Sequence, residues 1–401
     1  MKDRLIAQWS LFRKSNWLLT GAVCMLLVLG VLFVYSACFV SDEVEVKPLY
    51  LRQMLWIAVG VVCYMGFALL DFRRLRQHAW SIYAISIGLL VAVLLVGRTI
   101  YGARRWLMIF GDSGFGIQPS EMAKLATIIL LASRLSQAGR NLQKIGEVVM
   151  VLLLVALPAG LIIQQPDLGT AMVFVPTAMV LMFAAGVPFR YVGTLAGVGV
   201  GLVGYILAAL FLPALLGASG PVQERFVAMS GLSDYQRGRI EVFFHPEKDP
   251  LGAGWNKRQS EIAVGSGGLR GKGYLQGTQN ILGFLPRSVA PTDFIYSVVA
   301  EEKGFMGSAL VLVLFSVVIL SGMLTALGTL DPMGRLLCAG ISTLLFFHVF
   351  INIAMTVGLM PITGLPLPLL SYGGTFMVVT MSALGIIQSV YIRSDRRVTY
   401  R

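Results

Sequence analysis

Apolar stretches long enough to cross a lipid bilayer recur along this chain, and they constrain its fold more than any other feature. A helix needs about 20 mostly apolar residues to span the hydrocarbon core. By that measure the sequence predicts ten spans, near residues 17–37, 54–70, 79–97, 119–137, 145–163, 168–186, 192–214, 305–326, 335–357 and 372–392. Charged residues make up only 13% of the chain, which excludes an ordinary soluble domain. We therefore predict an all-α membrane protein whose residues 1–401 form a single polytopic domain.

Basic residues mark one side of the predicted bundle. Lys or Arg occurs in each short connection on that side, at residues 71–76, 134–144, 187–190 and 327–335. Both chain ends also fall there, because the number of predicted spans is even. Short loops rich in Lys and Arg remain in the cytoplasm, so we predict that both termini are cytoplasmic. The opposite side then carries one large extracytoplasmic loop, residues 215–292, before the eighth helix.

The formal net charge of +12 does not require a nucleic-acid partner. Much of it lies in the connections that set the topology, and the remainder suits anionic lipid headgroups. Residue types that bind metals are sparse, since the 4 cysteines lie in apolar stretches without metal or disulfide spacing and the 3 histidines are scattered. We therefore predict neither nucleic-acid binding nor a metal centre.

A polar segment, residues 235–304, interrupts the apolar sequence and is the place where chemistry is expected. Its glycine run, residues 265–273, does not match a nucleotide-binding P-loop, because Ser266 replaces a required glycine and Gly273 follows Lys272 where Ser or Thr is needed. Free backbone N–H groups beside Arg270 and Lys272 would suit a phosphate or pyrophosphate. A surface loop without a ligand is the alternative interpretation.

Carboxylates are the strongest catalytic candidates in this segment. Asp293 precedes a predicted helix, where the helix dipole favours an anion. Ser297 and Glu301 follow it on the same helix face. An aspartate in this position can also be a simple helix cap.

Three other loops carry polar or irregular sequence. Glu121 and Lys124 lie three residues apart at the start of a span, so they form either a self-neutralising pair or the polar wall of a cavity open to the outer face. Asp167 lies in a tight turn and is interpreted as a helix cap. Residues 361–374 are apolar but contain three prolines and three glycines, which predicts a re-entrant segment buried in protein or beside a cavity.

Four separated motifs resemble, in their order along the chain, the SEDS family of shape, elongation, division and sporulation proteins. They are GARRWL with QPSEMAK, QQPDLGTAM, YQRGRI with the polar run that ends in TDFIYSVVAEEKGFMG, and PITGLPLPLLSYGG. The resemblance covers nearly the whole chain and leans toward the rod-shape branch rather than the division branch. The fold it implies has ten spans and cytoplasmic ends, in agreement with the topology predicted above.

The resemblance also implies an activity and its residues. Members of the family are peptidoglycan glycosyltransferases that polymerise lipid II at the outer face of the cytoplasmic membrane. The family's essential aspartate corresponds to Asp293, which would be the catalytic base. Its sensitive tryptophan corresponds to Trp106, and its paired acidic and basic residues correspond to Glu121 and Lys124. Further candidates for substrate binding are Arg239, Gln259, Ser260, Arg270 and Lys272.

Partners and cofactors follow from the same resemblance. The expected partners are lipid II, a class B penicillin-binding protein that acts as transpeptidase, and other proteins of the elongation complex. A divalent cation, Mg or Mn, would suit the pyrophosphate, although the sequence shows no dedicated cage of ligands. One departure from the family pattern matters: the usual Glu and His before TDF are replaced by Pro286–Pro291. The role of that Glu or His is then either unfilled or taken by Glu301 or Glu302.

Other functions are compatible with such a chain. It could move a lipid-linked precursor across the membrane, hold a partner enzyme as a scaffold, or serve division instead of elongation. The polar residues gather on the predicted outer side rather than at the bilayer midplane, which argues against a transporter. We therefore expect an enzyme in the cytoplasmic membrane whose active site faces the periplasm or the cell exterior.

Overall fold

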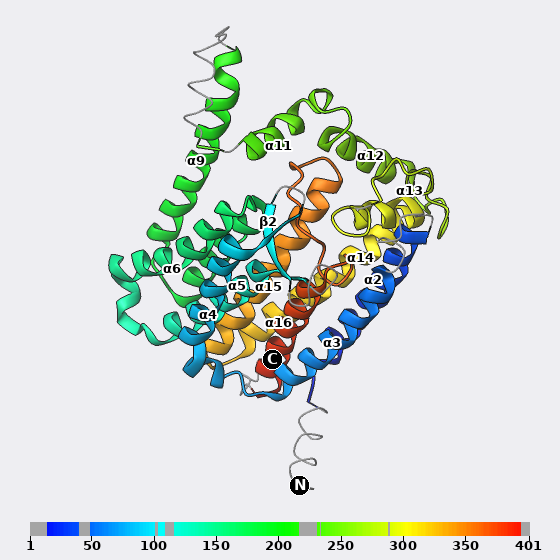
Figure 1. The fold of residues 1–401 in the computed structure, drawn as a ribbon. Helices are drawn as coiled ribbons and strands as arrows, with labels where there is room; N and C mark the ends of the chain where they lie inside the picture. The colour runs from blue at the N-terminus through cyan, green and yellow to red at the C-terminus, as the bar shows by residue number, and fades with distance from the viewer. Residues whose placement is uncertain are drawn as a thin grey trace.

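The computed structural model describes residues 14–39, 49–100, 103–108, 116–215, 231–232, 234–287 and 289–393. These residues form a bundle of mostly long helices (Figure 1). The helices of the bundle are α2 (Trp17–Phe39), α3 (Leu49–Leu69), α4 (Arg74–Val96), α5 (Pro119–Gln137), α6 (Ile145–Gln164), α7 (Leu168–Met172), α8 (Phe174–Ala185), α9 (Phe189–Leu215), α14 (Ile295–Gly328), α15 (Pro332–Thr356) and α16 (Gly374–Arg393).

Helices occur at every predicted span, and the helical membrane class is confirmed. Within the described residues, 9 helical stretches are long and apolar enough to cross a bilayer. The remaining predicted span corresponds to α5, which carries Glu121, Lys124 and Arg134 among its 19 residues. Residues 168–186 were expected to form one span, and Leu168–Ala185 do so, with a single turn residue, Val173, between α7 and α8.

The centre of the bundle is formed by α5, α15 and α16, whose side chains are mostly buried. α16 packs along α3, and α14 packs against both α15 and α2. Lipid is as apolar as these side chains, so the helices are held together by close packing and polar contacts rather than by hydrophobic attraction. α9 buries few residues and lies at the edge of the bundle (Figure 1).

Short helices of the polar segment lie across one end of the bundle, which we call the loop end (Figure 1). They are α11 (Asp234–Phe244), the 3₁₀ helix η2 (Pro246–Lys248), α12 (Ala253–Ser266) and α13 (Thr278–Ile281). A small antiparallel sheet precedes α5, in the order β1 (Arg98–Ile100), β2 (Ala103–Met108) and β3 (Gly116–Ile117). The sequence predicts only loops in both places, because elements this short carry no clear apolar period.

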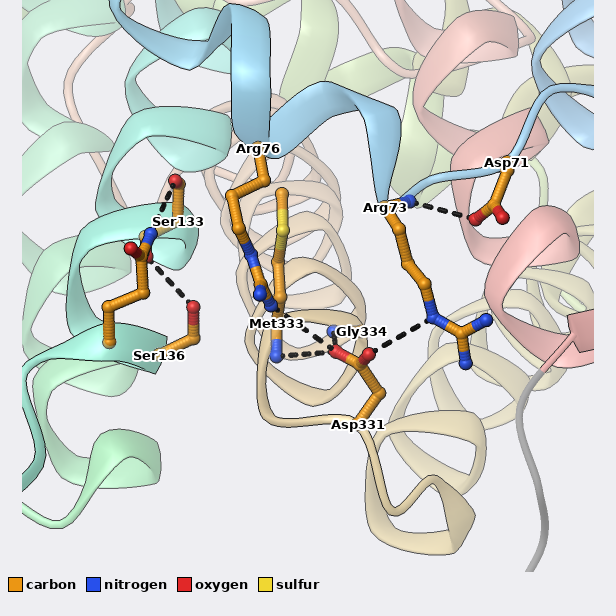
Figure 2. A network of polar contacts seen from close by, with 9 residues as sticks. Asp71, Arg73, Arg76, Ser133, Ser136, Asp331, Met333 and Gly334 are labelled. Carbon is orange, nitrogen blue, oxygen red and sulfur yellow. Dashed lines mark hydrogen bonds and ion pairs between the residues drawn. The ribbon is translucent and has the colours of Figure 1, made fainter.

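At the opposite end, two connections that the sequence places on the same side meet around Asp331 (Figure 2). The Asp331 carboxylate caps α15 by accepting hydrogen bonds from two backbone N–H groups, at 2.9 and 3.0 Å. It also lies 3.3 Å from Arg73 Nε and 4.0 Å from Arg76 Nη2. Ion pairs therefore join the connections 71–76 and 327–335, which agrees with the prediction that both lie on the same side of the membrane.

A kink at Gly304 divides α14 into a short segment near the loop end and a long apolar segment. Gly304 has φ 61° and ψ −158°, a conformation essentially restricted to glycine. The glycine run packs its backbone against this kink, since a Cβ on Gly271 would lie 2.2 Å from the Glu302 carbonyl oxygen. The N–H groups of residues 271–273 donate to carbonyl oxygens at 2.8–3.0 Å. These three N–H groups are therefore not free for a phosphate, because they already bond within the protein, and phosphate binding by the rest of the run stays a prediction.

Candidate active site

Asp293 lies at the loop end, two residues before α14, in a turn held by the surrounding chain. Its N–H donates to the Val289 carbonyl oxygen at 3.0 Å. The proline-rich segment, residues 361–374, packs against the same turn. The Ser371 hydroxyl and the Tyr372 N–H donate to carbonyl oxygens of the two residues before Asp293, at 2.5 and 2.9 Å. The predicted irregular segment is thus part of the wall around this aspartate.

A buried amide joins the two segments. Asn352 of α15 is 0% exposed, and its Nδ2 donates both to the Asp293 carbonyl oxygen at 2.9 Å and to the Leu365 carbonyl oxygen at 2.7 Å. Leaving such a buried group unsatisfied costs about 1–3 kcal/mol. Asn352 therefore fixes the backbone of Asp293 relative to the proline-rich segment.

Arg239 of α11 and the Asp293 carboxylate approach each other beside Gly364. Gly364 has φ 75°, in the left-handed region that favours glycine. A Cβ at this position would lie 3.6 Å from Asp293 Oδ2 and 3.7 Å from Arg239 Nη1. Arg239 Nη1 also donates to the Ile362 carbonyl oxygen at 2.8 Å. The glycine therefore brings the backbone close to both charged groups.

A second arginine, Arg105 of β2, contributes charge to the site. Its guanidinium donates to the Gln165 carbonyl oxygen at 3.2 Å and to the Pro166 carbonyl oxygen, and lies 4.0 Å from the Asp167 carboxylate. Asp167 caps α7 by accepting from the N–H and the hydroxyl of Thr170, at 3.2 and 3.0 Å. The predicted cap is confirmed, and the same carboxylate also orients Arg105.

The surroundings of Asp293 change its acidity. Burial raises the pKa of Asp293 from 3.8 to about 6, while the charges on Arg239 and Arg105 lower it and the carboxylate of Asp167 raises it further. Burial disfavours the charged form of an acid, and nearby cations favour it. A carboxyl group with a pKa near 6 is mostly ionised at neutral pH and still a useful proton acceptor, as a general base must be.

The donor set around Asp293 does not resemble a metal cage. Among the described residues, no three His, Cys, Asp or Glu side chains come close enough together to hold a metal ion. The charged groups that act on Asp293 are two arginines and one further carboxylate, whereas Mg²⁺ prefers an octahedral set of oxygen ligands. The described residues therefore form no dedicated metal cage, and a divalent cation held mainly by the diphosphate of a substrate stays a prediction.

Glu121 and Lys124 lie deep in the bundle, each 2% exposed. Lys124 Nζ donates to Glu121 Oε1 at 2.8 Å and lies 2.7 Å from His348 Nε2 of α15. Its ammonium group is also 5.7 Å from the ring centroid of Phe376 on α16. The self-neutralising pair is therefore present and is extended by His348, while contact with a substrate stays a prediction.

Gln259 and Ser260 lie on α12, and both are buried. Ser260 Oγ is 2.7 Å from Ser297 Oγ of α14 and donates to the Thr356 carbonyl oxygen of α15, also at 2.7 Å. Ser260 thus links α12, at the loop end, to the long helices α14 and α15 by hydrogen bonds. Its role in substrate binding stays a prediction, as does that of Gln259.

Glu301 and Glu302 bond to side chains other than that of Asp293. Lys272 Nζ donates to Glu301 Oε1 at 2.7 Å. Glu302 accepts a hydrogen bond from Ser36 of α2. The interpretation that Glu301 or Glu302 replaces the family's missing glutamate finds no support in these contacts.

Arg270 and Trp106 occupy two further places. Arg270 is exposed and lines a groove together with residues of α2 and α14. Trp106 of β2 packs its ring against β3, where a Cβ on Gly116 would lie 3.0 Å from a ring carbon. Their contacts with a substrate remain predictions.

Several residues of the site have weak sequence signals. From the sequence alone, Asp167 is predicted only to cap a helix, and neither Arg105 nor Asn352 is predicted to belong to the site. The signal for Arg105 is its position directly before Trp106 in a family motif. The signal for Asn352 is a polar side chain within an apolar span, which is a functional hypothesis in any membrane protein.

Comparisons with known proteins place the chain in a family. Residues 16–396 match the family model of FtsW, RodA and SpoVE, which is described as a cell cycle protein. The peptidoglycan glycosyltransferase RodA of Treponema pallidum is 34% identical over 430 residues, covering 94% of this chain and 98% of that protein. The peptidoglycan glycosyltransferase MrdB of Escherichia coli K12 is 38% identical over 371 residues, covering 92% of each.

Solved structures agree with these relatives. A chain from a peptidoglycan synthase complex has a TM-score of 0.72 at 30% identity, covering 94% of this chain and 97% of that one. The rod shape determining protein RodA of Thermus thermophilus has a TM-score of 0.65 at 28% identity, covering 96% and 98%. These matches extend over nearly the full length of each protein, so the resemblance read from the motifs is confirmed. This chain belongs to the FtsW/RodA/SpoVE family.

Proposed function

We propose that this protein is a peptidoglycan glycosyltransferase that polymerises lipid II, with Asp293 as its catalytic base. The observation that carries the proposal is the Asp293 carboxyl, whose pKa is raised to about 6 and on which the charges of Arg239 and Arg105 act. Relatives from Treponema pallidum and Escherichia coli that are named for this activity support the class of reaction.

In the proposed reaction, the 4-hydroxyl of the acceptor N-acetylglucosamine attacks the anomeric carbon of the lipid-linked N-acetylmuramic acid. Asp293 takes the hydroxyl proton as the new glycosidic C–O bond forms. The bond between the anomeric carbon and the diphosphate oxygen breaks, and its electron pair leaves with undecaprenyl diphosphate. Attack from the face opposite the leaving group inverts the anomeric centre from α to β, so one base and a stabilised leaving group are sufficient.

Arg239 and Arg105 are the proposed stabilisers of the leaving diphosphate. A guanidinium group offers planar, paired donors to phosphate oxygens. Backbone carbonyl groups hold Arg239 and Arg105 in place, at 2.8 and 3.2 Å, so their orientation is set before the substrate binds. Removing one such preorganised donor typically lowers a rate by about 10²–10³-fold. Lys272 is a weaker candidate because its ammonium group already bonds to Glu301.

The loop end is proposed to face the periplasm or the cell exterior, in the cytoplasmic membrane. Support comes from the basic short connections, which are expected to stay in the cytoplasm. A class B penicillin-binding protein is the proposed partner, together with other elongation proteins. The similarity to a chain of a peptidoglycan synthase complex supports this partnership.

The decisive test is polymerisation of labelled lipid II by the purified protein, resolved on a gel, with and without the transpeptidase. We expect polymer from the wild type. Asp293→Asn keeps the size of the side chain but removes the proton acceptor, so the rate should fall about 10²–10⁴-fold. Asp331→Asn is the matched control, because it changes a capping aspartate at the opposite end and Asn also caps helices.

Each contrary outcome has a distinct meaning. Equal polymerisation by Asp293→Asn would remove Asp293 as the base but keep the enzyme. Absence of polymer from the wild type, even with the partner present, would contradict the glycosyltransferase. Movement of lipid II across vesicle membranes would then favour a transporter, and polymer made by the partner alone would favour a scaffold.

A further inference from the structure

We propose that a groove between α2 and α14 binds an anionic phospholipid, whose phosphate pairs with Arg270 and Lys303. The groove has a volume of about 640 Å³. Its apolar walls come from both helices and include Leu29, Leu32 and Phe33 of α2 and Val299, Met306 and Leu310 of α14. A hydrocarbon chain is the natural occupant of such walls in a bilayer.

The charged groups at the groove differ in exposure according to their sign. Arg270 and Lys303 both line the groove, and both are exposed. Glu301 and Glu302 are each 1% exposed, and each is bonded to a neighbouring side chain. The charges that face the occupant are therefore positive, which favours a phospholipid of net negative charge over one whose phosphate is balanced by its own cationic group.

The two cations lie at the depth expected for lipid headgroups. Lys303 directly precedes the kink of α14, and residues 305–328 beyond it are apolar. The Tyr274 ring lies 5.5 Å from Lys303 Nζ, and its hydroxyl donates to the Leu32 carbonyl oxygen at 2.9 Å. Tyrosine is enriched where membrane meets water. The cations therefore lie at the interface, with the apolar walls at the depth of acyl chains.

This groove is separate from the Asp293 site. Lys303 follows Asp293 by ten residues, which corresponds to about 15 Å along a helix. A diphosphate that reacts must have its anomeric carbon within a few ångströms of the base. The phosphate in the groove is therefore not the diphosphate that leaves in the proposed reaction. Its binding does not depend on the proposed reaction.

Native mass spectrometry of the full-length protein, in detergent with equal amounts of phosphatidylglycerol and phosphatidylcholine, tests the proposal. Each basic residue near an anionic lipid is worth about fivefold in affinity, so the wild type should prefer phosphatidylglycerol by roughly thirtyfold. The double variant Arg270→Gln/Lys303→Gln should lose most of this preference. Lys248→Gln/Arg258→Gln is the matched control, since it removes two exposed loop-end cations that lie outside the groove.

A second variant tests the apolar walls. Leu310→Trp fills the groove and leaves both cations in place, so it should reduce retention of phosphatidylglycerol about tenfold, close to the loss of about two buried methylene groups. Adsorption of the headgroup alone would leave retention unchanged and would contradict the proposal. This variant also carries the test if the double variant fails to fold, as judged by size-exclusion chromatography.

Three further results would overturn the phospholipid site. They are equal retention of the two phospholipids by the wild type, an unchanged preference in Arg270→Gln/Lys303→Gln, and displacement of phosphatidylglycerol by an equimolar amount of undecaprenyl diphosphate. The last result would assign the groove to the product of the proposed reaction instead.

Discussion

At the scale of single residues, the environment of Asp293 decides what its carboxyl group can do. An aspartate in water has a pKa near 4, too low to make it an efficient acceptor of a sugar hydroxyl proton at neutral pH. Burial raises the pKa of Asp293 to about 6, and the charges of Arg239 and Arg105 limit the rise. The same arginines are the proposed partners of the leaving diphosphate, so the proposed mechanism gives them a role in both proton transfer and departure of the leaving group.

The pH dependence of polymerisation should report this carboxyl. Protonated Asp293 cannot act as a base, so kcat/KM should fall about tenfold per pH unit below the pKa and level off above pH ~7. Because the charge of Arg239 lowers the pKa of Asp293, Arg239→Gln should move the break to higher pH as well as slowing the reaction. Initial rates between pH ~4.5 and ~8 would measure both effects.

Arg258→Gln is the control for this profile, since Arg258 is an exposed loop-end cation 3.8 Å from Glu247, and its charge is not among those that act on Asp293. Its break should stay at the wild-type pH. A profile that is flat from pH ~5 to ~8, or a break that Arg239→Gln leaves in place, would contradict the assignment.

At the scale of secondary structure, the kink at Gly304 allows one part of α14 to pack at the loop end and the other part to span the membrane. The first segment of α14, before Gly304, follows Asp293 and contributes Ser297, which contacts Ser260 of α12. The segment after Gly304 is long and apolar enough to cross the bilayer. The glycine run of the polar segment packs into the bend between them. The kink therefore couples the loop end to a membrane-spanning helix.

Gly304→Ala should destabilise the protein. Its conformation is one that an L-residue rarely adopts, at a cost of about 1–3 kcal/mol, and the new Cβ would lie 2.4 Å from the Gly271 nitrogen. We expect a fall of several degrees in the apparent Tm, measured by a thermal-shift assay. Gly328→Ala in the same helix meets no atom within 4 Å and should be neutral. Equal melting of the two variants would show that the kink carries no strain.

At the scale of the whole molecule, the buried pair Glu121–Lys124 connects three central helices. It lies on α5, reaches His348 on α15 and lies beside Phe376 on α16. Removing one partner of a buried ion pair is strongly destabilising, because the remaining charge is left without compensation. Replacing both partners by apolar groups of similar size is often close to neutral.

A double-mutant cycle on this pair should therefore show strong coupling. Lys124→Met alone should cost about 3–5 kcal/mol, and Glu121→Leu/Lys124→Met should recover most of that loss. Denaturant-induced unfolding in detergent measures the stability, and lipid II polymerisation by the recovered double variant then decides whether the pair also contacts substrate. A double variant no more stable than Lys124→Met would mean that the two side chains are not a coupled pair.

The sequence alone determined the membrane class and the positions of the long helices, and it identified Asp293 as the candidate base. A span is a local property, because the bilayer penalises each polar residue and each unpaired backbone group wherever it lies. The motif around Asp293 is also continuous in the chain, so it can be recognised without a structure.

Only the tertiary structure decided which groups surround Asp293. Arg105, Asp167, Arg239 and Asn352 lie on four separate elements, and no local pattern predicts that they meet at one aspartate. The same holds for residues 271–273 of the glycine run, whose N–H groups would be free in an isolated loop but bond to α14 and to Gly267. A bilayer selects spans residue by residue, whereas a site depends on long-range packing that brings distant segments together.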